Sequence, residues 1–255
     1  MKATLLQTDI QWADPLSNRE HLQEMIRSLQ GGSDLIVLPE MFSTGFATSP
    51  EGIAEDDPAP SLDWMHHISE ETSAALCGSI AVHLGEGDYR NRFYFVLPDG
   101  SEFHYDKHHL FTYSGEHVHY TPGNERVIVT WKGVRFLLLV CYDLRFPVFS
   151  RNRGDYDAVI YVASWPSSRQ GAWDTLLRAR AIENQCYVLG VNRVGTDPKC
   201  SYDGGTVMVD PYGNVISGVP YKEEGVCEGN LDMEILEAFR AKFPVLSDSD
   251  PFTMP

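Results

Sequence analysis

Hydrophobic and polar positions in the N-terminal part of the chain alternate between two periodicities. Residues 3–9 and 34–40 are short apolar runs rich in branched side chains, which predicts two buried strands. Between them, residues 15–30 carry apolar side chains at helical spacing, and Gly31 and Gly32 predict the end of that helix. A strand, a helix and a second strand in this order predict parallel strands joined by a right-handed crossover.

The same alternation continues along the rest of the chain, with hairpin turns between some of the strands. The PDG segment at 98–100 and the KG segment at 132–133 predict two of these turns. The further predicted strands cover residues 76–83, 92–97, 102–105, 126–131, 134–140, 157–163 and 186–191, with another hairpin around 211–214. The further predicted helices cover residues 61–74, 171–185 and 232–242. This alternation predicts an α/β fold with one mixed sheet, or a pair of sheets, covered by helices.

The chain is long enough for one large domain. Hydrophobic residues make up 43% of its 255 positions, which is ample for a sizeable core, and no linker rich in Pro, Gly or Ser divides it. We therefore predict a single domain over residues 1–255. From about residue 243 the regular periodicities end, which predicts an extended C-terminal tail.

Charge and cysteine content narrow the range of partners and compartments. Lys and Arg total 20 against 36 Asp and Glu, a formal charge of −16, and this charge repels phosphate backbones and anionic membrane surfaces. No segment has the length and apolarity of a signal-peptide core or a membrane span. The five cysteines are scattered, without a CxxC pair, which favours a reduced compartment over a disulfide framework. We therefore predict a cytoplasmic protein that binds neither nucleic acid nor membranes.

Three chemically reactive residues end predicted strands or follow them closely. Glu40 ends the strand at 34–40, Lys107 follows the first hairpin, and Cys141 directly follows the most apolar run of the chain. Catalytic groups of α/β folds gather at the carboxyl ends of strands. We therefore expect these three side chains to lie close together.

The chemistry of the three residues is complementary. A thiol is a poor nucleophile until it loses its proton, and a carboxylate in a desolvated pocket has a raised pKa, so Glu40 can take that proton and return it to a leaving amine. Lys107 can stabilise the thiolate and then the tetrahedral oxyanion, for which one preorganised donor contributes about 3 kcal/mol. Taken singly, Cys141 could be an inert core thiol, Glu40 an ordinary strand-end carboxylate and Lys107 a surface lysine. Their joint spacing favours a catalytic site.

The three segments, in this order and at these separations, resemble the Glu, Lys, Cys signature of the nitrilase superfamily of carbon–nitrogen hydrolases. Comparable segments surround them, so the resemblance covers nearly the whole chain. These segments are GF at 45–46, NR at 91–92, YTPG at 120–123 and RARAIEN at 178–184. The resemblance implies a four-layer αββα sandwich of two mixed sheets covered by helices. It also implies a homodimer or higher homo-oligomer in which the sheets continue across the pair.

A narrower resemblance, to the bacterial omega-amidase branch, lies in three motifs. They are YSGEHVHY at 113–120, CYDLRFPVFSRNR at 141–153 and YVASWP at 161–166. This resemblance implies hydrolysis of the terminal amide of 2-oxoglutaramate, succinamate and related dicarboxylate monoamides, without a metal or organic cofactor. Glu116 matches the second glutamate that the superfamily places in the pocket, and its implied role is to orient Lys107 and position the substrate amide. Pairing with a neighbouring histidine is the alternative role for Glu116.

The predicted reaction passes through a thioester. Cys141 attacks the amide carbonyl while Glu40 accepts its proton, and Lys107 and the backbone N–H of Tyr142 hold the oxyanion. Ammonia leaves with a proton from Glu40. A water molecule activated by Glu40 then hydrolyses the thioester to the carboxylate product.

The choice of substrate depends on local charge. Because the chain is strongly acidic overall, an anionic substrate needs a local cation, and Arg145 lies four residues past Cys141. We predict that Arg145 pairs bidentately with the distal carboxylate of the substrate. A salt bridge from Arg145 to Asp143 or Glu116 is the alternative. The candidate walls of the pocket are Phe42, Phe46, Phe111 and Trp165.

Several histidines crowd one region of the chain. They are His104, His108, His109, His117 and His119. One interpretation is a metal-dependent hydrolase in which His117 and His119 are a ligand pair. No HExxH motif or carboxylate-rich metal signature accompanies them, so we predict no metal and favour packing around the loop that carries Lys107 and Glu116.

Two other hypotheses remain open from the sequence. One keeps the superfamily but changes the substrate to deaminated glutathione, a nitrile or a carbamoyl compound. The other is a catalytically silent binding protein with the same fold, which predicts the loss of at least one of Glu40, Lys107 and Cys141. All three residues are present, which favours the enzyme.

Overall fold

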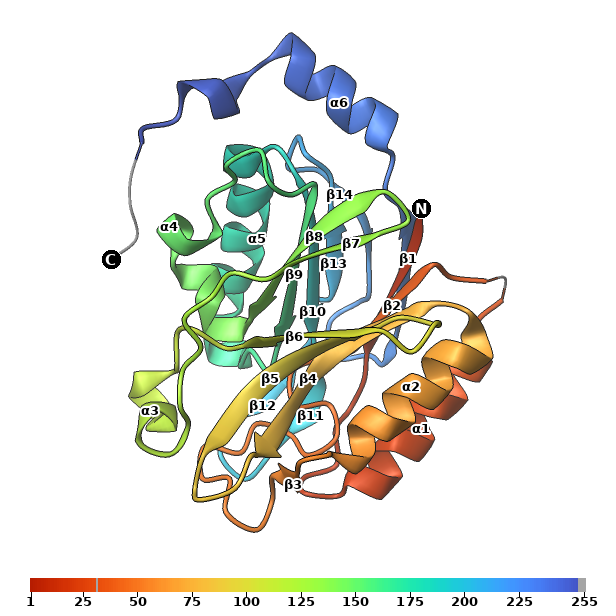
Figure 1. Cartoon of the computed structure of the whole chain (residues 1–255), viewed down its shortest axis with the longest axis vertical. Coiled ribbons are helices and arrows are strands. Elements are labelled where there is room, and N and C mark those ends of the chain that lie inside the picture. The colour runs from red at the N-terminus through yellow and green to blue at the C-terminus, as the bar shows by residue number, and fades with distance from the viewer. Residues whose placement is uncertain (31, 252–255) are drawn as a thin grey trace.

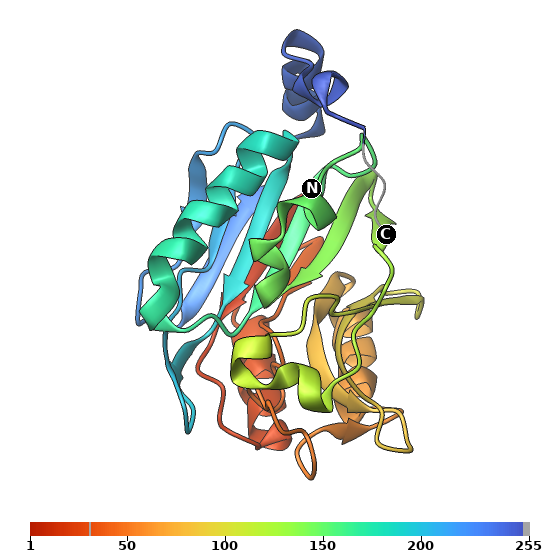
Figure 2. The same cartoon turned by 90° about the vertical axis from the view of Figure 1, so that its left-hand side faces the viewer.

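The structure is a computed structural model that describes residues 1–30 and 32–251 of the chain. Two large sheets pack face to face, and helices cover the outer face of each sheet (Figure 1). Helices α1 (Pro15–Arg27) and α2 (Pro60–Thr72) lie against one sheet, and α5 (Gln170–Asn184) lies against the other (Figures 1 and 2). The predicted αββα sandwich is confirmed.

The first sheet has seven strands within the described residues. They are β1 (Lys2–Gln7), β2 (Leu35–Val37), β3 (Glu55–Asp56), β4 (Ala75–His83), β5 (Tyr89–Val96), β6 (Glu102–Asp106) and β15 (Gly225–Asn230). Their order is β15-β1-β2-β4-β5-β6, with β3 paired to β4. Strands β1, β2 and β4 are parallel, and helices α1 and α2 lie in the crossovers that parallel strands require.

The second sheet has six strands in the part of the chain that the structure describes. They are β7 (Ile128–Trp131), β8 (Val134–Val140), β9 (Ala158–Ala163), β10 (Tyr187–Asn192), β13 (Val207–Val209) and β14 (Val215–Gly218). Their order is β14-β13-β10-β9-β8-β7, in which β8, β9 and β10 are parallel. A separate hairpin joins β11 (Val194–Thr196) to β12 (Ser201–Asp203). The carboxyl ends of β8, β9 and β10 therefore lie at one edge of the sheet.

The largest apolar cluster lies between the two sheets and continues under α5. Phe95 on β5 contacts Phe136 on β8, with ring centroids 5.9 Å apart, and Trp173 of α5 belongs to the same cluster. A second cluster, which includes Met65, fills the space between the first sheet and helices α1 and α2. Every residue of β8 except Arg135 is buried. The uninterrupted apolar run before Cys141 is thus a strand with both faces covered.

Most predicted helices and strands are present, with boundaries that differ by a few residues. The helix predicted over 15–30 ends earlier, at Arg27, where the backbone N–H of Ser28 still bonds to carbonyls of the last turn. Gly32 comes after the end of the helix, and Gly31 lies outside the described residues. A hydroxyl and a backbone amide, instead of a glycine, therefore close this helix.

Strand β15 has no counterpart among the predicted strands. Its sequence, GVCEGN, lacks a clear alternation of apolar and polar residues. It pairs with β1 along the whole length of that strand, from Lys2 opposite Asn230 to Gln7 opposite Gly225. The first sheet therefore joins segments that are far apart in the sequence.

Helix α6 (Met233–Lys242) lies beyond the edges of both sheets (Figures 1 and 2). Arg240 ties it to the rest of the molecule by donating to Asp157 Oδ1 and to the carbonyl oxygen of Tyr156, both at 2.9 Å. Apolar contacts also hold the helix, since Leu236 is buried in the core and the ring centroids of Phe239 and Tyr212 are 4.0 Å apart.

An extended tail is predicted from about residue 243 onward. In the structure, the segment after α6 is not extended throughout. Val245–Asp248 form a 3-10 turn, in which the backbone N–H of Ser247 bonds to the carbonyl oxygen of Pro244 at 3.0 Å. Local hydrogen bonds, which the lack of periodicity does not reveal, shape this part of the tail. Within the described residues, no helix has the length and apolarity needed to cross a membrane.

Candidate active site

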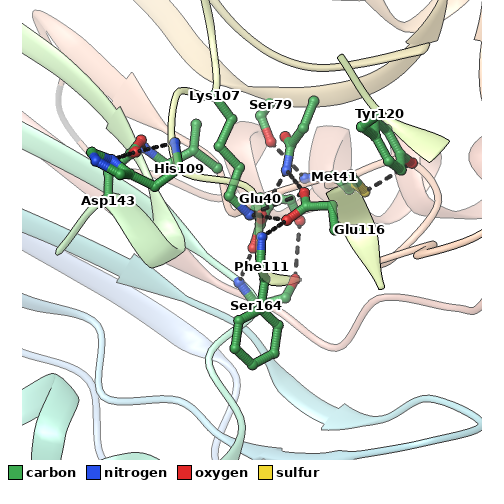
Figure 3. A network of polar contacts seen from close by, with 12 residues as sticks. Glu40, Met41, Ser79, Lys107, His109, Phe111, Glu116, Tyr120, Asp143 and Ser164 are labelled. Carbon is green, nitrogen blue, oxygen red and sulfur yellow. Dashed lines mark hydrogen bonds and ion pairs between the residues drawn. The ribbon is translucent and has the colours of Figure 1, made fainter. Parts of the chain in front are cut away.

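Four separate segments bring the predicted catalytic side chains together. Cys141 directly follows β8 of the second sheet, while Glu40 and Lys107 come after β2 and β6 of the first sheet. Glu116 begins the short helix α3 (Glu116–His119). Figure 3 shows Glu40, Lys107 and Glu116 pointing toward one another. The expectation that these strand ends meet is therefore fulfilled in the structure.

Cys141 occupies a sharp turn between β8 and the 3-10 turn Cys141–Arg145. Its φ of 46° lies in the left-handed region, which costs a residue with a Cβ roughly 1–2 kcal/mol. The buried Asp143 holds this turn, because its Oδ2 accepts hydrogen bonds from the N–H of Val140 at 2.9 Å and from the hydroxyl of Tyr105 at 2.8 Å. Cys141 is partly exposed, unlike the strand before it. A strained turn that presents a side chain at a strand end is typical of a nucleophile.

A buried ion cluster, formed by Lys107, Glu40 and Glu116, lies next to the thiol. Lys107 Nζ donates to Glu40 Oε1 at 3.0 Å and to Glu116 Oε2 and Oε1 at 2.9 and 3.1 Å. The three side chains are 0% exposed. Buried charges persist only when they are paired and hydrogen-bonded, and here two carboxylates share one ammonium. The cluster therefore holds both carboxylates in fixed positions around the lysine.

Neutral donors complete the ion cluster. Asn91 Nδ2 donates to Glu40 Oε1 at 2.7 Å and to Glu116 Oε1 at 3.2 Å. The backbone N–H of Ser164 donates to Glu40 Oε2 at 2.7 Å, and that of Phe111 donates to Glu116. Asn91 and Ser164 are not among the predicted site residues, because neither carries a charge or a reactive atom. Both lie in segments that carry the family resemblance, and that is the sequence signal available for them.

The electrostatics of the ion cluster keep the lysine charged and the thiol protonated. Burial opposes the charge on Lys107, but Glu116 and Glu40 outweigh it and raise the pKa of Lys107. Burial, with a contribution from Glu40 that Lys107 partly offsets, raises the pKa of Cys141 well above its usual value. Burial also raises the pKa of Glu116, an effect that Lys107 opposes and Glu40 reinforces. A thiol that rests in its neutral form needs a base at the moment of attack.

A cavity opens at Cys141. Three of the predicted walls, Phe46, Phe111 and Trp165, line it, and so does Arg145. Its other lining residues include Tyr142, Thr48, Arg169, Asp197, Lys199 and Cys200. Apolar walls that carry a few convergent polar groups are typical of a small-molecule site.

Comparisons with known proteins agree with this geometry. The family model described as carbon-nitrogen hydrolase matches residues 2–241. The chain belongs to the carbon–nitrogen hydrolase family. The omega-amidase YafV of Yersinia enterocolitica is 45% identical over 258 residues, which cover 100% of this chain and 98% of that protein. The 2-oxoglutaramate amidase of Bacillus subtilis is 32% identical over 255 residues, which cover 97% of this chain and 98% of that protein.

A solved structure extends the likeness to three dimensions. XC1258 of Xanthomonas campestris is a CN-hydrolase superfamily protein whose crystal structure holds an arsenic adduct in the active site. It matches with a TM-score of 0.96 and 40% identity, and the match covers 100% of this chain and 99% of that one. The predicted superfamily, fold and enzyme class, a hydrolase of carbon–nitrogen bonds, are therefore confirmed.

Phe42 is not a wall of the cavity in this carbon–nitrogen hydrolase, so its prediction as a substrate-binding residue is wrong. It is fully buried and packs against Trp64 of α2, with ring centroids 5.7 Å apart. The chain turns at Met41, whose φ is 44°, and this turn directs Phe42 into the core beside Gly78 of β4. Phe46, further along the same loop, reaches the cavity instead.

Three cations line the cavity, of which the sequence analysis names one. Arg145 lies over the ring of Trp165, 5.0 Å from its centroid, and Arg169 lies over the ring of Phe111 at 5.1 Å. Lys199 comes from the loop between β11 and β12. Arg169 and Lys199 carry no motif, and only the folding of their loops onto the cavity makes them part of the site.

The carboxylates that could pair with Arg145 are engaged elsewhere. Asp143 accepts a hydrogen bond from Tyr105 and pairs with His109 at 2.8 Å, and Glu116 belongs to the ion cluster. Among the described residues, no carboxylate forms an ion pair with Arg145 or Arg169. The alternative of an internal salt bridge for Arg145 is therefore not what the structure shows, and its guanidinium borders the cavity.

His108 and His109 contact each other and Phe149, while His119 has its partner elsewhere. His109 stacks on Phe146 in addition to its contact with Asp143, and His108 stacks on Phe149 and bonds to the carbonyl oxygen of Gly123 at 2.7 Å. His119 pairs with Glu51 at 2.8 Å. In the part of the chain that the structure describes, no three His, Cys, Asp or Glu side chains are grouped so that they could hold a metal ion. His108 and His109 thus pack around the segment that carries Lys107.

Proposed function

We propose that this carbon–nitrogen hydrolase is a cysteine-dependent amidase that removes the terminal amide of short dicarboxylate monoamides, such as 2-oxoglutaramate or succinamate. The observation that carries the proposal is Arg145, a guanidinium that pairs with no carboxylate of residues 1–30 and 32–251 and borders the cavity that Cys141 also lines. A substrate with an amide at one end and a carboxylate at the other would occupy both groups at once. The products are ammonia and a dicarboxylate.

The first half of the proposed reaction forms a thioester. Cys141 attacks the amide carbonyl, and its proton passes to Glu40 as the S–C bond forms. The oxyanion is held by Lys107 and by the backbone N–H of Tyr142, which follows Cys141 at the start of the 3-10 turn, where N–H groups have no partner within the helix. The tetrahedral intermediate then collapses, the C–N bond breaks, and Glu40 returns the proton so that ammonia leaves.

The second half of the reaction releases the acid. A water molecule gives a proton to Glu40 and attacks the thioester carbon, and the same oxyanion donors act again. Collapse of this intermediate breaks the S–C bond, and Glu40 gives its proton to the departing sulfur, which restores the thiol and the Glu40 carboxylate. Glu116 holds Lys107 in place throughout, since it accepts two hydrogen bonds from Lys107 Nζ.

The selectivity for an anionic substrate is supported by the contrast between the cavity and the rest of the molecule. The chain carries a formal charge of −16, yet Arg145, Arg169 and Lys199 all line the cavity, with Asp197 as the acidic lining residue. Asp197 is occupied by the Tyr202 hydroxyl and two backbone N–H groups. The names of two relatives, an omega-amidase and a 2-oxoglutaramate amidase, agree with this substrate class.

The test compares an anionic and a neutral amide in the wild-type enzyme and in Arg145→Leu. We expect kcat/KM for succinamate and 2-oxoglutaramate to fall about 10- to 100-fold, because a hydrogen-bonded charge pair is lost. Butyramide lacks the distal carboxylate, so its kcat/KM should change less than about threefold. Ammonia release measures both substrates, and Cys141→Ala should release none.

Arg27→Leu is the matched control, since Arg27 is an exposed arginine on α1 that pairs with Glu71 far from the cavity. It should leave both substrates unaffected. An equal loss on butyramide and succinamate in Arg145→Leu would contradict the assignment of Arg145. A wild-type preference for neutral amides, nitriles or peptide-like amides would contradict the substrate class itself.

A further inference from the structure

Asn91 touches every charged member of the ion cluster. It lies on β5 opposite Ala81 of β4 and is 1% exposed. Its Nδ2 donates to Glu40 Oε1 at 2.7 Å and to Glu116 Oε1 at 3.2 Å, and its backbone carbonyl accepts from the N–H of Lys107 at 3.0 Å. One neutral residue therefore holds both carboxylates and the backbone that carries the lysine.

The charges around the side-chain amide of Asn91 determine which way that amide faces. Asn91 Oδ1 is buried and has no hydrogen-bond partner among the described residues. A buried acceptor without a donor is unfavourable, and such a group calls for an explanation. If the amide were turned over, Oδ1 would face two carboxylate oxygens, which would be worse while both carboxylates are ionised. Asn91 thus donates to both glutamates at the expense of its own carbonyl.

The charges of the surrounding groups do not balance. Lys107, after β6, supplies one positive charge against Glu40 and Glu116. The other titratable groups that act on the carboxylates are the thiol of Cys141, after β8, and the phenol of Tyr120, after α3. Burial raises the pKa of both well above their usual values, so both are neutral near pH 7. The excess negative charge can be stabilised by a donor such as Asn91 or by a proton taken up on a glutamate.

We propose that Asn91 is a positioning residue that holds the Glu40 carboxylate beside Cys141 by donating a hydrogen bond to it, so that Glu40 can act as the base. The inference rests on the proposed cysteine mechanism. By donating to both carboxylates, the amide stabilises the state in which the proton stays on the thiol until attack. The proton passes to Glu40 as the S–C bond forms and leaves with the amide nitrogen as the C–N bond breaks.

The test follows the acidic limb of the pH profile in Asn91→Ala and in the isosteric Asn91→Asp. Loss of a donor to an ionised carboxylate raises its pKa, so the limb of kcat/KM should move to higher pH by about one unit in Asn91→Ala. Asn91→Asp adds a third carboxylate beside one lysine, so its limb should move further. Because the base is affected more than the binding of substrate, kcat should fall and KM should change little.

A second readout needs no substrate. The pH dependence of Cys141 alkylation by iodoacetamide, followed by intact mass, should shift by the same amount in each variant. This measurement separates the role proposed for Asn91 from the proposed substrate class. The pH dependence of alkylation can be measured even if the enzyme prefers another amide. Asn152→Ala is the matched control, because Asn152 is a buried asparagine that bonds to the carbonyls of Tyr156 and Asn184.

The outcomes are distinct. Upward shifts in both Asn91 variants, with an unmoved limb in Asn152→Ala, support the positioning role. Lower stability with both limbs unmoved would assign Asn91 a structural role and overturn the proposal. Asn91→Asp with a wild-type limb would overturn it as well, even if Asn91→Ala fails to fold.

Discussion

Two groups of positive charge lie near Cys141, and they are built in opposite ways. Lys107 is fully buried, touches two carboxylates, and receives further support from Asn91 through its backbone. Arg145 and Arg169, by contrast, stack on aromatic rings at a cavity and have no carboxylate partner among the described residues. A cation that must stabilise a reaction intermediate is paired and immobile in advance. In the proposed function, Arg145 keeps its hydrogen-bonding capacity for the substrate carboxylate.

The contrast also concerns what each region can tolerate. Changes in the ion cluster alter the charge balance among side chains that are fully buried, so they should affect stability and catalysis together. Changes at the cavity affect side chains that have no internal partner, so they should affect the choice of substrate more than the fold. Substitutions in the two regions should therefore have separable effects.

The largest effect is expected from Lys107→Met, which keeps the length of the side chain and removes its charge. Two carboxylates then remain buried without a cation, and breaking a buried pair costs roughly 3–5 kcal/mol in the free energy of unfolding. Activity should fall by about 10³-fold or more, because an oxyanion donor is lost as well. Urea unfolding and ammonia release measure the two effects.

Lys199→Met at the cavity is the matched control for Lys107→Met. Its expected change in the free energy of unfolding is within about 0.5 kcal/mol, since Lys199 contacts the hydroxyl of Thr48 and no carboxylate. If both variants lost the same stability, the distinction between the two regions would be wrong.

An intermediate effect is expected from Glu116→Gln. Burial raises the pKa of Glu116, so the folded protein binds its proton more tightly than the unfolded chain does. This residue therefore makes stability fall as pH rises above about 4.3, the ordinary pKa of a glutamate. Glu116→Gln should flatten that part of the stability curve, and it should lower activity about 10- to 100-fold because Lys107 loses one of its two carboxylate partners. Thermal unfolding between pH 4 and pH 8, with the exposed Glu71→Gln as the control, tests the sign. A slope that is unchanged or steeper would contradict it.

The smallest effect is expected from Arg169→Leu. Arg169 adds positive potential to the cavity without a direct place in the proposed reaction, so KM for succinamate should rise about 3- to 10-fold while kcat stays nearly constant. The value for butyramide should not change. Steady-state ammonia release at low and high salt checks this, because a long-range charge effect weakens with ionic strength. A fall in kcat for both amides would place Arg169 in the catalytic machinery instead.

The sequence predicts which chemically reactive side chains lie together, because their chemistry and their position coincide. Glu40, Lys107 and Cys141 each carry a reactive group at the end of a strand, and parallel strand ends converge in space. Glu116 begins a helix of one turn outside the predicted strands and helices, and it can be assigned only through the family resemblance. The spacing of apolar residues does not predict the order of strands in each sheet either. Strand β15, for example, pairs with β1 from the other end of the chain.

The sequence predicts the surroundings of the reactive residues less well. Phe42 and Phe46 are two aromatic residues on one loop, and only the turn at Met41 decides which of them enters the cavity. Asn91 has no reactive atom, and residue type alone does not mark it as part of the site. It belongs to the site because it donates hydrogen bonds to two carboxylates from other elements. Side-chain direction and contacts between elements depend on the packed structure, which residue type and spacing do not determine.

The pairing of β1 with β15 has a consequence for synthesis of the enzyme on the ribosome. The amino group of Met1 bonds to the carbonyl oxygen of Leu231, 230 positions away, and β1 also neighbours β2, the strand that precedes Glu40. A nascent chain that has not yet released residues 225–230 therefore leaves one edge of β1 unpaired, and such long-range contacts form late. Until residues 225–230 have paired with β1, the first sheet is incomplete beside the strand that precedes Glu40, so we expect the proposed base to be held in place only after that pairing has formed.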